Sequence, residues 1–259
     1  MIKIVLYTIL GVLGAVLLYL AFLAICAYVF VDPKKEYTHN SRFYRHLLYF
    51  PTRIVLFLIG VRIHTTGLEK MPEGRFLIVS NHRSNFDPLV SWRVLEKYDI
   101  AYISKFSNFK IPIWGRIIRK CCFLGINRED AREGMKTIIK AIKLIKEDEV
   151  SIGIYPEGTR SKTCELLPFH PGSFKVAQSA NVPIVVVTVQ GTEMIHRNFP
   201  FHGTDVRLDL LEVIPAETVK AMKTTEIAEH VHKLMAKHLG EISQEIEGER
   251  NETVHLIQS

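Results

Sequence analysis

An apolar run near its start constrains this chain more than any other feature of the sequence. No charged residue occurs from Ile4 to Val31, in the run "IVLYTILGVLGAVLLYLAFLAICAYVFV". At about 1.5 Å per helical residue, this run is longer than the ~30 Å hydrocarbon core of a bilayer. We therefore expect a membrane-spanning helix at the start of the chain.

A cleaved secretory signal is the alternative, because the run is preceded by only one lysine, Lys3. The apolar regions of cleavable signals are about 7 to 15 residues long, so the length favours a retained segment. The residues that follow the run are rich in positive charge: Lys34, Lys35, Arg42, Arg45, Arg53 and Arg62. The positive-inside bias places everything after Asp32 on the cytoplasmic face of the membrane.

A second apolar stretch, "LLYFPTRIVLFLIGV" from Leu47 to Val61, is interrupted by Pro51 and Arg53. It is too short and too interrupted for a confident span, which favours an interfacial or re-entrant segment over a buried core helix. We expect residues 1–59 to form a membrane-associated part and residues 60–259 a cytoplasmic domain.

The formal charge of +6 does not indicate nucleic-acid binding, because the basic residues are spread along the chain without a recognisable binding motif. An anionic membrane surface and an anionic substrate explain the excess equally well. The four cysteines show no C-x-x-C spacing and the eleven histidines show no H-E-x-x-H pattern, so no metal site and no disulfide framework is expected.

After about Gly60 the sequence alternates between strands and helices. Short runs rich in β-branched residues begin near residues 61, 75, 100, 122, 150, 182 and 206. A helix is expected from Asp130 to about Glu147, capped by Asp130, with one apolar face made of Met135, Ile138, Ile139, Ile142 and Ile145. Another is expected from about Thr225 to Leu239, with Ile227, Val231 and Leu234 facing inward. This pattern predicts one α/β domain with a mixed sheet covered by helices.

The stretch "NHRSNFDP", Asn81 to Pro88, follows an apolar strand and places a histidine five residues before an aspartate. Loops at the carboxyl ends of strands are where open α/β sheets usually build their sites. Asp87 before Pro88 is also a common helix opening, so it could be only a cap. A carboxylate has enough acceptor sites to cap a helix and to hold the ring of His82 as a general base.

The stretch "YPEGTRS", Tyr155 to Ser161, follows another apolar strand. A Pro-Gly turn is common at such a place, but the turn alone does not explain a guanidinium and two hydroxyls around one glycine. Arginine offers a fork of donors that matches phosphate oxygens, which suggests a phosphate-monoester site. A third segment, residues 105–130, supplies Lys105 and Arg128 on either side of a Pro112 to Gly115 break, and the apolar run from Val182 to Thr192 reads as a buried structural strand.

These motifs, in this order and spacing, resemble those of the 1-acyl-sn-glycerol-3-phosphate acyltransferase family of membrane-bound glycerolipid acyltransferases. His82 and Asp87 are similar to the H-x₄-D motif of that family. The second block is similar around Lys105, Gly125 and Arg128, and residues 155–161 and 182–187 resemble the third and fourth blocks. The resemblance covers roughly residues 60–215. His170 and Pro171 depart from it, since basic residues are expected at that place.

The resemblance implies the acyltransferase fold with an N-terminal two-helix membrane element. It implies that His82 is the general base and Asp87 its partner, and that a set of substrate-binding residues holds the phosphate and glycerol of the acceptor: Lys105, Arg128, Glu157, Gly158, Thr159 and Arg160. It implies no cofactor and no metal beyond the acyl thioester co-substrate, either acyl-CoA or acyl carrier protein.

The expected reaction is transfer of a fatty acyl chain to the 2-hydroxyl of lysophosphatidate in the bilayer, giving phosphatidate for phospholipid biosynthesis. A different lysolipid acceptor, such as a lyso-ornithine lipid or a lysophospholipid, is the nearest alternative. Hydrolysis by a membrane thioesterase or lipase is a further one, although no G-x-S-x-G elbow occurs. A non-catalytic membrane scaffold would be recognised if His82→Ala left its function untouched.

Overall fold

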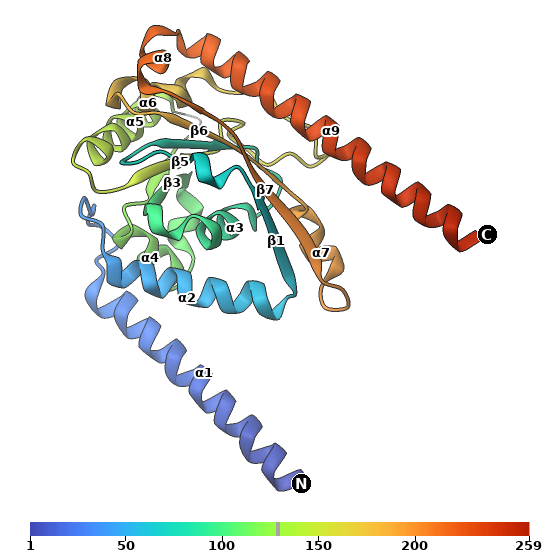
Figure 1. Cartoon of the computed structure of the whole chain (residues 1–259). Coiled ribbons are helices and arrows are strands. Elements are labelled where there is room, and N and C mark those ends of the chain that lie inside the picture. The colour runs from blue at the N-terminus through green and yellow to red at the C-terminus, as the bar shows by residue number, and fades with distance from the viewer. Residues whose placement is uncertain (128–129, 259) are drawn as a thin grey trace.

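The computed structural model describes residues 1–127 and 130–258 of the chain. A twisted sheet lies at the centre, helices cover its faces, and the long helices at the two ends of the chain project away from it (Figure 1). The sheet of this described part has seven strands: β1 (Val61–Thr66), β2 (Leu77–Ser80), β3 (Ile100–Lys105), β4 (Leu124–Ile126), β5 (Ser151–Ile154), β6 (Ile184–Gln190) and β7 (Thr204–Ile214). Each expected strand is present, and the predicted α/β fold is confirmed.

The strand order is β1-β7-β6-β2-β5-β3-β4. All neighbouring strands are parallel except β6 and β7, so the mixed, mostly parallel sheet expected from the sequence is confirmed. The strands β2, β5 and β6 are buried along their whole length, which is why their sequences are nearly continuous apolar runs. Because β2, β5, β3 and β4 run in the same direction, their carboxyl ends share one edge of the sheet.

The longer helices of the domain are α3 (Asp87–Val94), α4 (Trp114–Lys120), α5 (Ala131–Lys146), α6 (Lys175–Ala180), α8 (Ala216–Ala221) and α9 (Thr224–Gln258), with the one-turn α7 (Ile195–Asn198) near the end of β6. Asp130 caps α5 as predicted, since its side chain accepts from the backbone N–H groups of Arg132 and Glu133. Five 3₁₀ turns lie between these elements: Leu68–Lys70, Glu96–Tyr98, Phe106–Lys110, Pro171–Phe174 and Thr192–Met194.

Two details of the expected helices were wrong. On α5, Met135 and Ile139 are exposed, while Ile138 and Ile145 are buried together with Ala141 and Leu144. Met135 and Ile139 lie at the margin of the apolar stripe, beyond the arc that packs on the rest of the domain. The last helix, α9, starts near the expected place but continues far beyond Leu239 and leaves the body of the domain. Ile227 and Val231 are fully buried as predicted, whereas Leu234 is only half-buried.

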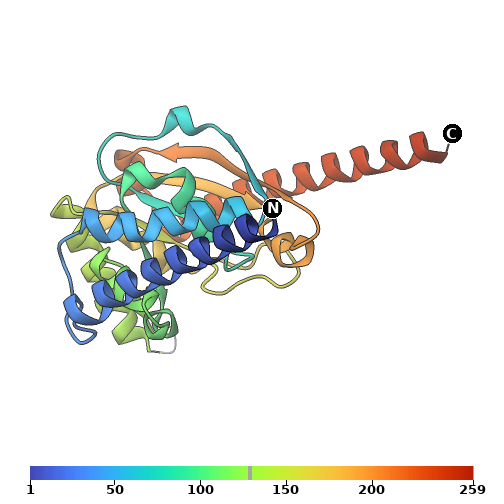
Figure 2. The same ribbon diagram turned by 90° about the horizontal axis from the view of Figure 1, so that it is seen from below.

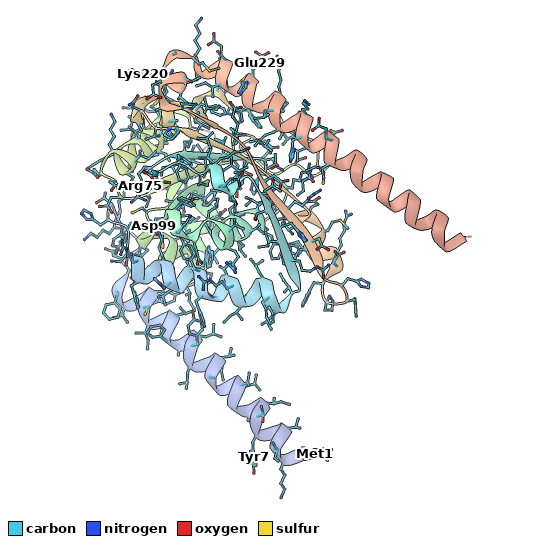
Figure 3. The ribbon with its side chains drawn as sticks, viewed as in Figure 1. Met1, Tyr7, Arg75, Asp99, Lys220 and Glu229 are labelled. Atoms are coloured by element: carbon cyan, nitrogen blue, oxygen red, sulfur yellow. The ribbon has the colours of Figure 1, made fainter. Side chains whose placement is uncertain are left out.

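Helix α1 (Ile2–Phe30) is the one helix of the described residues that is long and apolar enough to cross a membrane. Its side chains are exposed over most of its length, and Figure 3 shows Met1 and Tyr7 far from the rest of the molecule. Only its C-terminal part packs on the domain, where the Cys26 carbonyl accepts from the Tyr44 hydroxyl at 2.9 Å. This helix is consistent with membrane association.

Helix α2 (Arg42–Leu58) starts five residues before the expected apolar stretch and continues through Pro51. One face is buried, with Leu48 and Leu56 in the core, and the opposite face exposes Phe57 and Leu58 together with Phe43, Phe50, Ile54 and Val55. In the view from below, α1 and α2 lie across the same side of the domain (Figure 2). The buried face fits a core helix and the exposed apolar face fits an interfacial segment, so the interfacial placement and the division at residue 59 stay predictions.

Candidate functional site

The candidate site lies at the carboxyl edge of the parallel strands, where the topology collects loops that are distant in sequence. His82 follows β2, Glu157 follows β5, and Lys105 ends β3. Since β5 pairs with both β2 and β3, these three positions come from neighbouring strands. The fold thus brings the first and third sequence motifs side by side.

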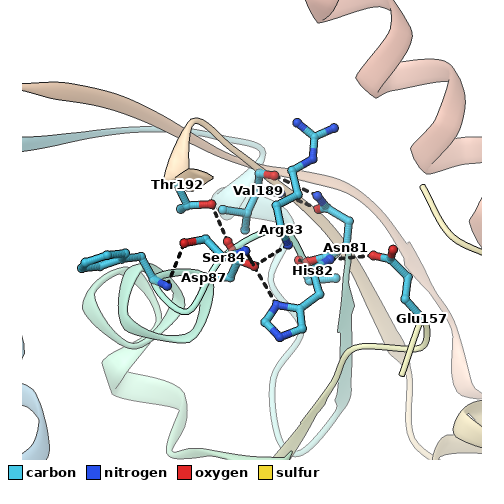
Figure 4. Close-up of polar contacts among 10 residues, drawn as sticks. Asn81, His82, Arg83, Ser84, Asp87, Glu157, Val189 and Thr192 are labelled. Atoms are coloured by element: carbon cyan, nitrogen blue, oxygen red, sulfur yellow. Dashed lines mark hydrogen bonds and ion pairs between the residues drawn. The ribbon is translucent and has the colours of Figure 1, made fainter. Parts of the chain in front are cut away.

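His82 and Asp87 form a hydrogen-bonded pair. The Nδ1 atom of His82 lies 2.7 Å from Oδ2 of Asp87, and this contact is one of the dashed lines in Figure 4. Asp87 is completely buried, and the His82 side chain is 16 % exposed. A buried carboxylate beside Nδ1 favours the tautomer that is protonated there. The other nitrogen, Nε2, is then left as a proton acceptor.

The carboxylate of Asp87 is held by further donors in the same loop and from a distant strand. Its Oδ2 also accepts from the backbone N–H groups of Arg83, at 2.7 Å, and Ser84, at 2.8 Å. Its Oδ1 accepts from the hydroxyl of Thr192 (Figure 4). Every one of these donors points at the carboxylate, so Asp87 has no freedom to turn away from His82.

The expectation that Asp87 caps its own helix was wrong. Helix α3 has Phe86 at its N-cap position without a capping side chain, and Asp87 is already the first helical residue. The carboxylate turns back towards residues 82–84 because the backbone donors there and the ring of His82 lie on that side. Pro88 does lie in the first turn, as expected.

The ring of His82 rests on an aromatic stack. Its centroid lies 4.1 Å from that of Tyr155, with 18° between the ring planes, and Tyr155 stacks in turn on Tyr102. Burial raises the pKa of Tyr155 well above its usual value, so the phenol stays neutral. The imidazole is thus fixed on its face by Tyr155 and at its edge by Asp87.

Glu157 supports the backbone of the site. One of its carboxylate oxygens accepts from the backbone N–H of His82 at 2.6 Å, and the other from that of Leu167 at 3.0 Å. The residue is only 4 % exposed, and burial raises the pKa of this carboxyl although both backbone donors oppose the shift. Glu157 was expected to bind substrate; each of its two oxygens accepts a backbone N–H group of the protein, and its substrate-binding role stays a prediction.

The rest of the third motif forms a tight turn. Gly158 has φ of +72°, and a Cβ at this position would lie 3.0 Å from the ring of His170, so this place requires glycine. Thr159 and Arg160 project their side chains into solvent. Ser161 returns to the site, since its backbone N–H donates to the carbonyl of His82 at 2.8 Å.

The remaining predicted binding residues, Lys105 and Arg128, come from the second motif and not from the turn after β5. Lys105 is exposed at the end of β3, on the same sheet edge as His82. Arg128 lies outside the described residues. The described cationic residues of the motifs are thus exposed after strands that neighbour one another in the sheet, and the substrate-binding roles stay predictions.

Two residues of the site were not predicted from the sequence as functional. Thr192 and the amide of Asn81 connect the loop after β2 to the end of β6, where Asn81 makes two hydrogen bonds, at 2.9 and 2.8 Å, with the backbone of Val189. The polar "TVQGT" ending of an otherwise apolar run was the available signal. Of the polar residues at this strand end, Thr192 contacts Asp87 directly.

Comparisons with known proteins point to one family. The family model described as "Acyltransferase" matches residues 62–190. The 1-acyl-sn-glycerol-3-phosphate acyltransferase of Haemophilus influenzae is 27 % identical over 193 residues, covering 73 % of this chain and 79 % of the relative. The Escherichia coli protein of the same name is 28 % identical over 173 residues, covering 67 % of this chain and 70 % of the relative.

The crystal structure of the 1-acyl-sn-glycerophosphate acyltransferase from Thermotoga maritima has the same fold. It superposes with a TM-score of 0.65 at 21 % identity, covering 77 % of this chain and 79 % of the other. The region matched by the family model, residues 62–190, contains His82 and Asp87, the supporting residues Tyr155 and Glu157, and the strands β2 and β5 that precede them. The chain therefore belongs to the family of the 1-acyl-sn-glycerol-3-phosphate acyltransferases, and it is an O-acyltransferase.

Proposed function

We propose that the protein transfers a fatty acyl chain from a thioester, acyl-CoA or acyl carrier protein, to the sn-2 hydroxyl of 1-acyl-sn-glycerol 3-phosphate. The proposal rests above all on the His82–Asp87 pair, in which a completely buried carboxylate lies 2.7 Å from Nδ1 and leaves Nε2 as the acceptor. The names of the relatives support the choice of acceptor.

In this reaction His82 is the general base. As the acceptor oxygen attacks the thioester carbonyl, its proton passes to Nε2 of His82, and the negative charge of Asp87 stabilises the imidazolium that forms. When the tetrahedral intermediate collapses, the C–S bond breaks and the departing thiolate takes the proton from Nε2. The products are the ester and the free thiol, and the base is regenerated without a covalent enzyme intermediate.

Glu157 and Tyr155 have positioning roles in this proposal. Glu157 fixes the backbone of His82 and Tyr155 fixes the face of its ring. A base held in this way does not need to reorganise before the proton transfer, which is the advantage of a preorganised site. We assign neither residue to direct contact with the substrate.

The phosphate of the acceptor is assigned to cationic side chains at the same edge. Lys105 and Arg160 are exposed there, and Gly158 and Thr159 shape the turn that carries Arg160. Arg128, which the family motif includes, completes the proposed set. A guanidinium and an ammonium suit a doubly charged phosphate monoester better than a zwitterionic headgroup.

The placement in the membrane is also a proposal. We infer that α1 anchors the protein in the bilayer, that the apolar face of α2 lies on the membrane, and that the catalytic domain faces the cytoplasm. The exposed apolar side chains of both helices and the positive charge after α1 support this arrangement. It brings the site to the surface in which both the acceptor and the product reside.

Thiol release by the full chain reconstituted in lipid nanodiscs tests the reaction. With an acyl thioester present, release should require lysophosphatidate, and His82→Ala should lower it by on the order of 10² or more. His230→Ala is the matched control, because His230 also contacts a carboxylate, Glu212 at 2.8 Å, but on the exposed surface away from the dyad. Release that no lysolipid stimulates would refute acyl transfer.

A panel of acceptors separates lysophosphatidate from other lysolipids. Arg160→Glu should raise the KM for lysophosphatidate roughly tenfold or more, since it replaces an attractive charge by a repulsive one. The KM for an acceptor without a phosphate monoester should be the same in Arg160→Glu and the wild type. If Arg160→Glu leaves the KM for lysophosphatidate unchanged, the assignment of the phosphate to this residue is wrong.

A further inference from the structure

We propose that the loop of residues 194–202 is a second membrane contact, whose apolar tip inserts into the surface of the bilayer beside α2. The proposal rests on the membrane placement given above. It assigns a lipid-binding role to a loop that begins two residues after Thr192, whose hydroxyl donates to Asp87. The bilayer would then lie next to the active site.

The tip of this loop is apolar and exposed. Phe201 is 84 % exposed and Phe199 is 51 % exposed, with Pro200 exposed between them, and Met194 at the start of the loop is 37 % exposed. Single exposed apolar residues are common on soluble surfaces, but two phenylalanines at the tip of one loop are not explained by packing. Aromatic and apolar tips of this kind are suited to the boundary between headgroups and acyl chains.

The loop continues the apolar surface of α2. The backbone N–H of Thr204, at the end of the loop, donates to the carbonyl of Gly60, at the end of α2, at 3.0 Å. Phe57 and Leu58 in the last turn of α2 are 81 % and 70 % exposed. Figure 1 shows the tip of the loop at the level of the C-terminal end of α2, and Figure 2 shows it beside that end from below.

Hydrogen bonds within the loop make its backbone suitable for a region that is poor in water. The carbonyl of Asn198 accepts from the backbone N–H groups of Phe201, at 3.0 Å, and His202, at 2.8 Å, and the N–H of Phe199 donates to the carbonyl of Ile195. The side chain of Asn198 closes the base by donating to Thr204 at 3.0 Å. A loop that satisfies its own donors can enter the membrane interface without the cost of unpaired backbone groups.

The charges around the tip suit an anionic membrane. Arg197 is exposed, and so are His196 and His202. Acidic groups near the loop are paired with cations of the domain, since Glu193 contacts Arg83 at 3.6 Å and Asp205 contacts Arg62. The positive side chain of Arg197 beside the apolar tip is attracted to anionic headgroups. This pattern selects a lipid surface over a second protein as the occupant.

The loop is joined to the catalytic dyad. Thr192, which donates to Asp87, lies two residues before the loop, and His196 in the loop lies edge-on to Phe86, the residue before Asp87, with ring centroids 4.9 Å apart. Ile195 is buried between these two contacts. Insertion of the tip would therefore orient the dyad relative to the membrane surface and place it at a fixed height above acceptors in the bilayer.

The depth of the tip can be measured with a fluorescent probe. Phe201→Cys in a Cys164→Ser background is labelled with an environment-sensitive fluorophore, because the other three cysteines are buried. The labelled full chain is reconstituted in phosphatidylcholine vesicles with and without phosphatidylglycerol. We expect a blue-shifted emission that is quenched by lipids carrying bromine on the acyl chain, more strongly with the anionic lipid.

The control carries the same probe at Ile139, which is 59 % exposed on α5, and it should report water and resist quenching. A probe at residue 201 that reports water in vesicles would overturn the proposal. So would a shielded probe that brominated lipids do not quench, since a protein partner or a second copy would then cover the tip. This measurement needs no catalysis, so it remains decisive even if the proposed acyl transfer fails.

Activity supplies a second test. Phe199→Gln combined with Phe201→Gln should lower acylation of a long-chain acceptor in vesicles roughly tenfold, because the variant loses the apolar contact with the bilayer. Acylation of a short-chain acceptor dissolved as a monomer should be unchanged. Met135→Gln with Ile139→Gln, which removes two exposed apolar residues from α5, should change neither rate. An equal loss on both acceptors would show that the loop acts only through the dyad and would overturn the membrane role.

Discussion

The hydroxyl of Thr192 donates to Oδ1 of Asp87, while the ring of His82 lies against Oδ2 of the same carboxylate. Each of the two side chains thus contacts a different oxygen of the Asp87 carboxylate. Thr192 lies 105 residues after Asp87 in the sequence. Thr192 follows Gly191, whose φ of +84° allows the sharp turn after β6, and a Cβ at Gly191 would lie 2.3 Å from the carbonyl oxygen of Asp205. The carboxylate of the candidate dyad is thus fixed by a residue that follows a strand distant in the sequence.

Replacing Thr192 by valine should lower kcat about tenfold and leave the KM for both substrates nearly unchanged, because a hydrogen bond to a buried carboxylate is lost. Thr192→Ser should restore most of the rate, since it keeps the hydroxyl. Steady-state kinetics and a thermal melt of the three proteins provide the test. A loss in Thr192→Val that serine does not restore would mean that packing, and not the hydrogen bond, supports the dyad.

The raised pKa of Glu157 predicts a pH dependence of stability. Because burial raises the pKa of this carboxyl in the folded state, its contribution to stability is fully present below the unfolded value, about 4.3, and is lost as the pH rises through the folded value. Glu157→Gln cannot ionise and lacks this term. We expect the melting temperature of the wild type, relative to Glu157→Gln, to fall as the pH rises above the unfolded value of about 4.3. A constant difference would contradict the raised pKa.

Arg45 is predicted to be the main polar anchor of α2. It is 1 % exposed, and its guanidinium donates to the carbonyls of Ile100, at 2.7 Å, and Cys121, at 3.1 Å. Arg45→Met leaves these buried acceptors without a partner and should lower the free energy of unfolding by about 3 kcal/mol.

The matched control is Arg53→Met on the same helix. Arg53 pairs with Glu96, but its side chain is 50 % exposed, so the loss should be below about 1 kcal/mol. Denaturant unfolding in detergent measures both variants. Equal losses would show that Arg45 has no special role in joining α2 to the domain.

The cysteines should differ in reactivity. Burial raises the pKa of Cys121 and of Cys122 to about 12, and both side chains are buried, whereas Cys164 is half-buried near the surface. Since the thiolate is the reactive form, iodoacetamide near pH 8 should modify Cys164 first in the folded protein. All four cysteines should react after unfolding. Mass spectrometry of a time course decides this, and early modification of Cys121 would contradict the buried packing of that pair.

Features that depend on neighbouring residues could be predicted from the amino-acid sequence. The charge-free run gave the long helix α1, the alternation of apolar runs gave seven strands in the right places, and the five-residue spacing of His82 and Asp87 allowed their pairing. Each of these follows from periodicity or from contacts within one or two turns, which the chain makes whatever its tertiary structure.

The distant residues that complete the site became evident from the strand order of the folded protein. Glu157 reaches the backbone of His82 from 75 residues away because β5 pairs with β2, and Thr192 reaches Asp87 because β6 pairs with β2 on the other side. The same cause places the 194–202 loop beside the end of α2, through the contact between Gly60 and Thr204. Strand order is set by the packing of the whole core, and no local pattern of residues encodes it.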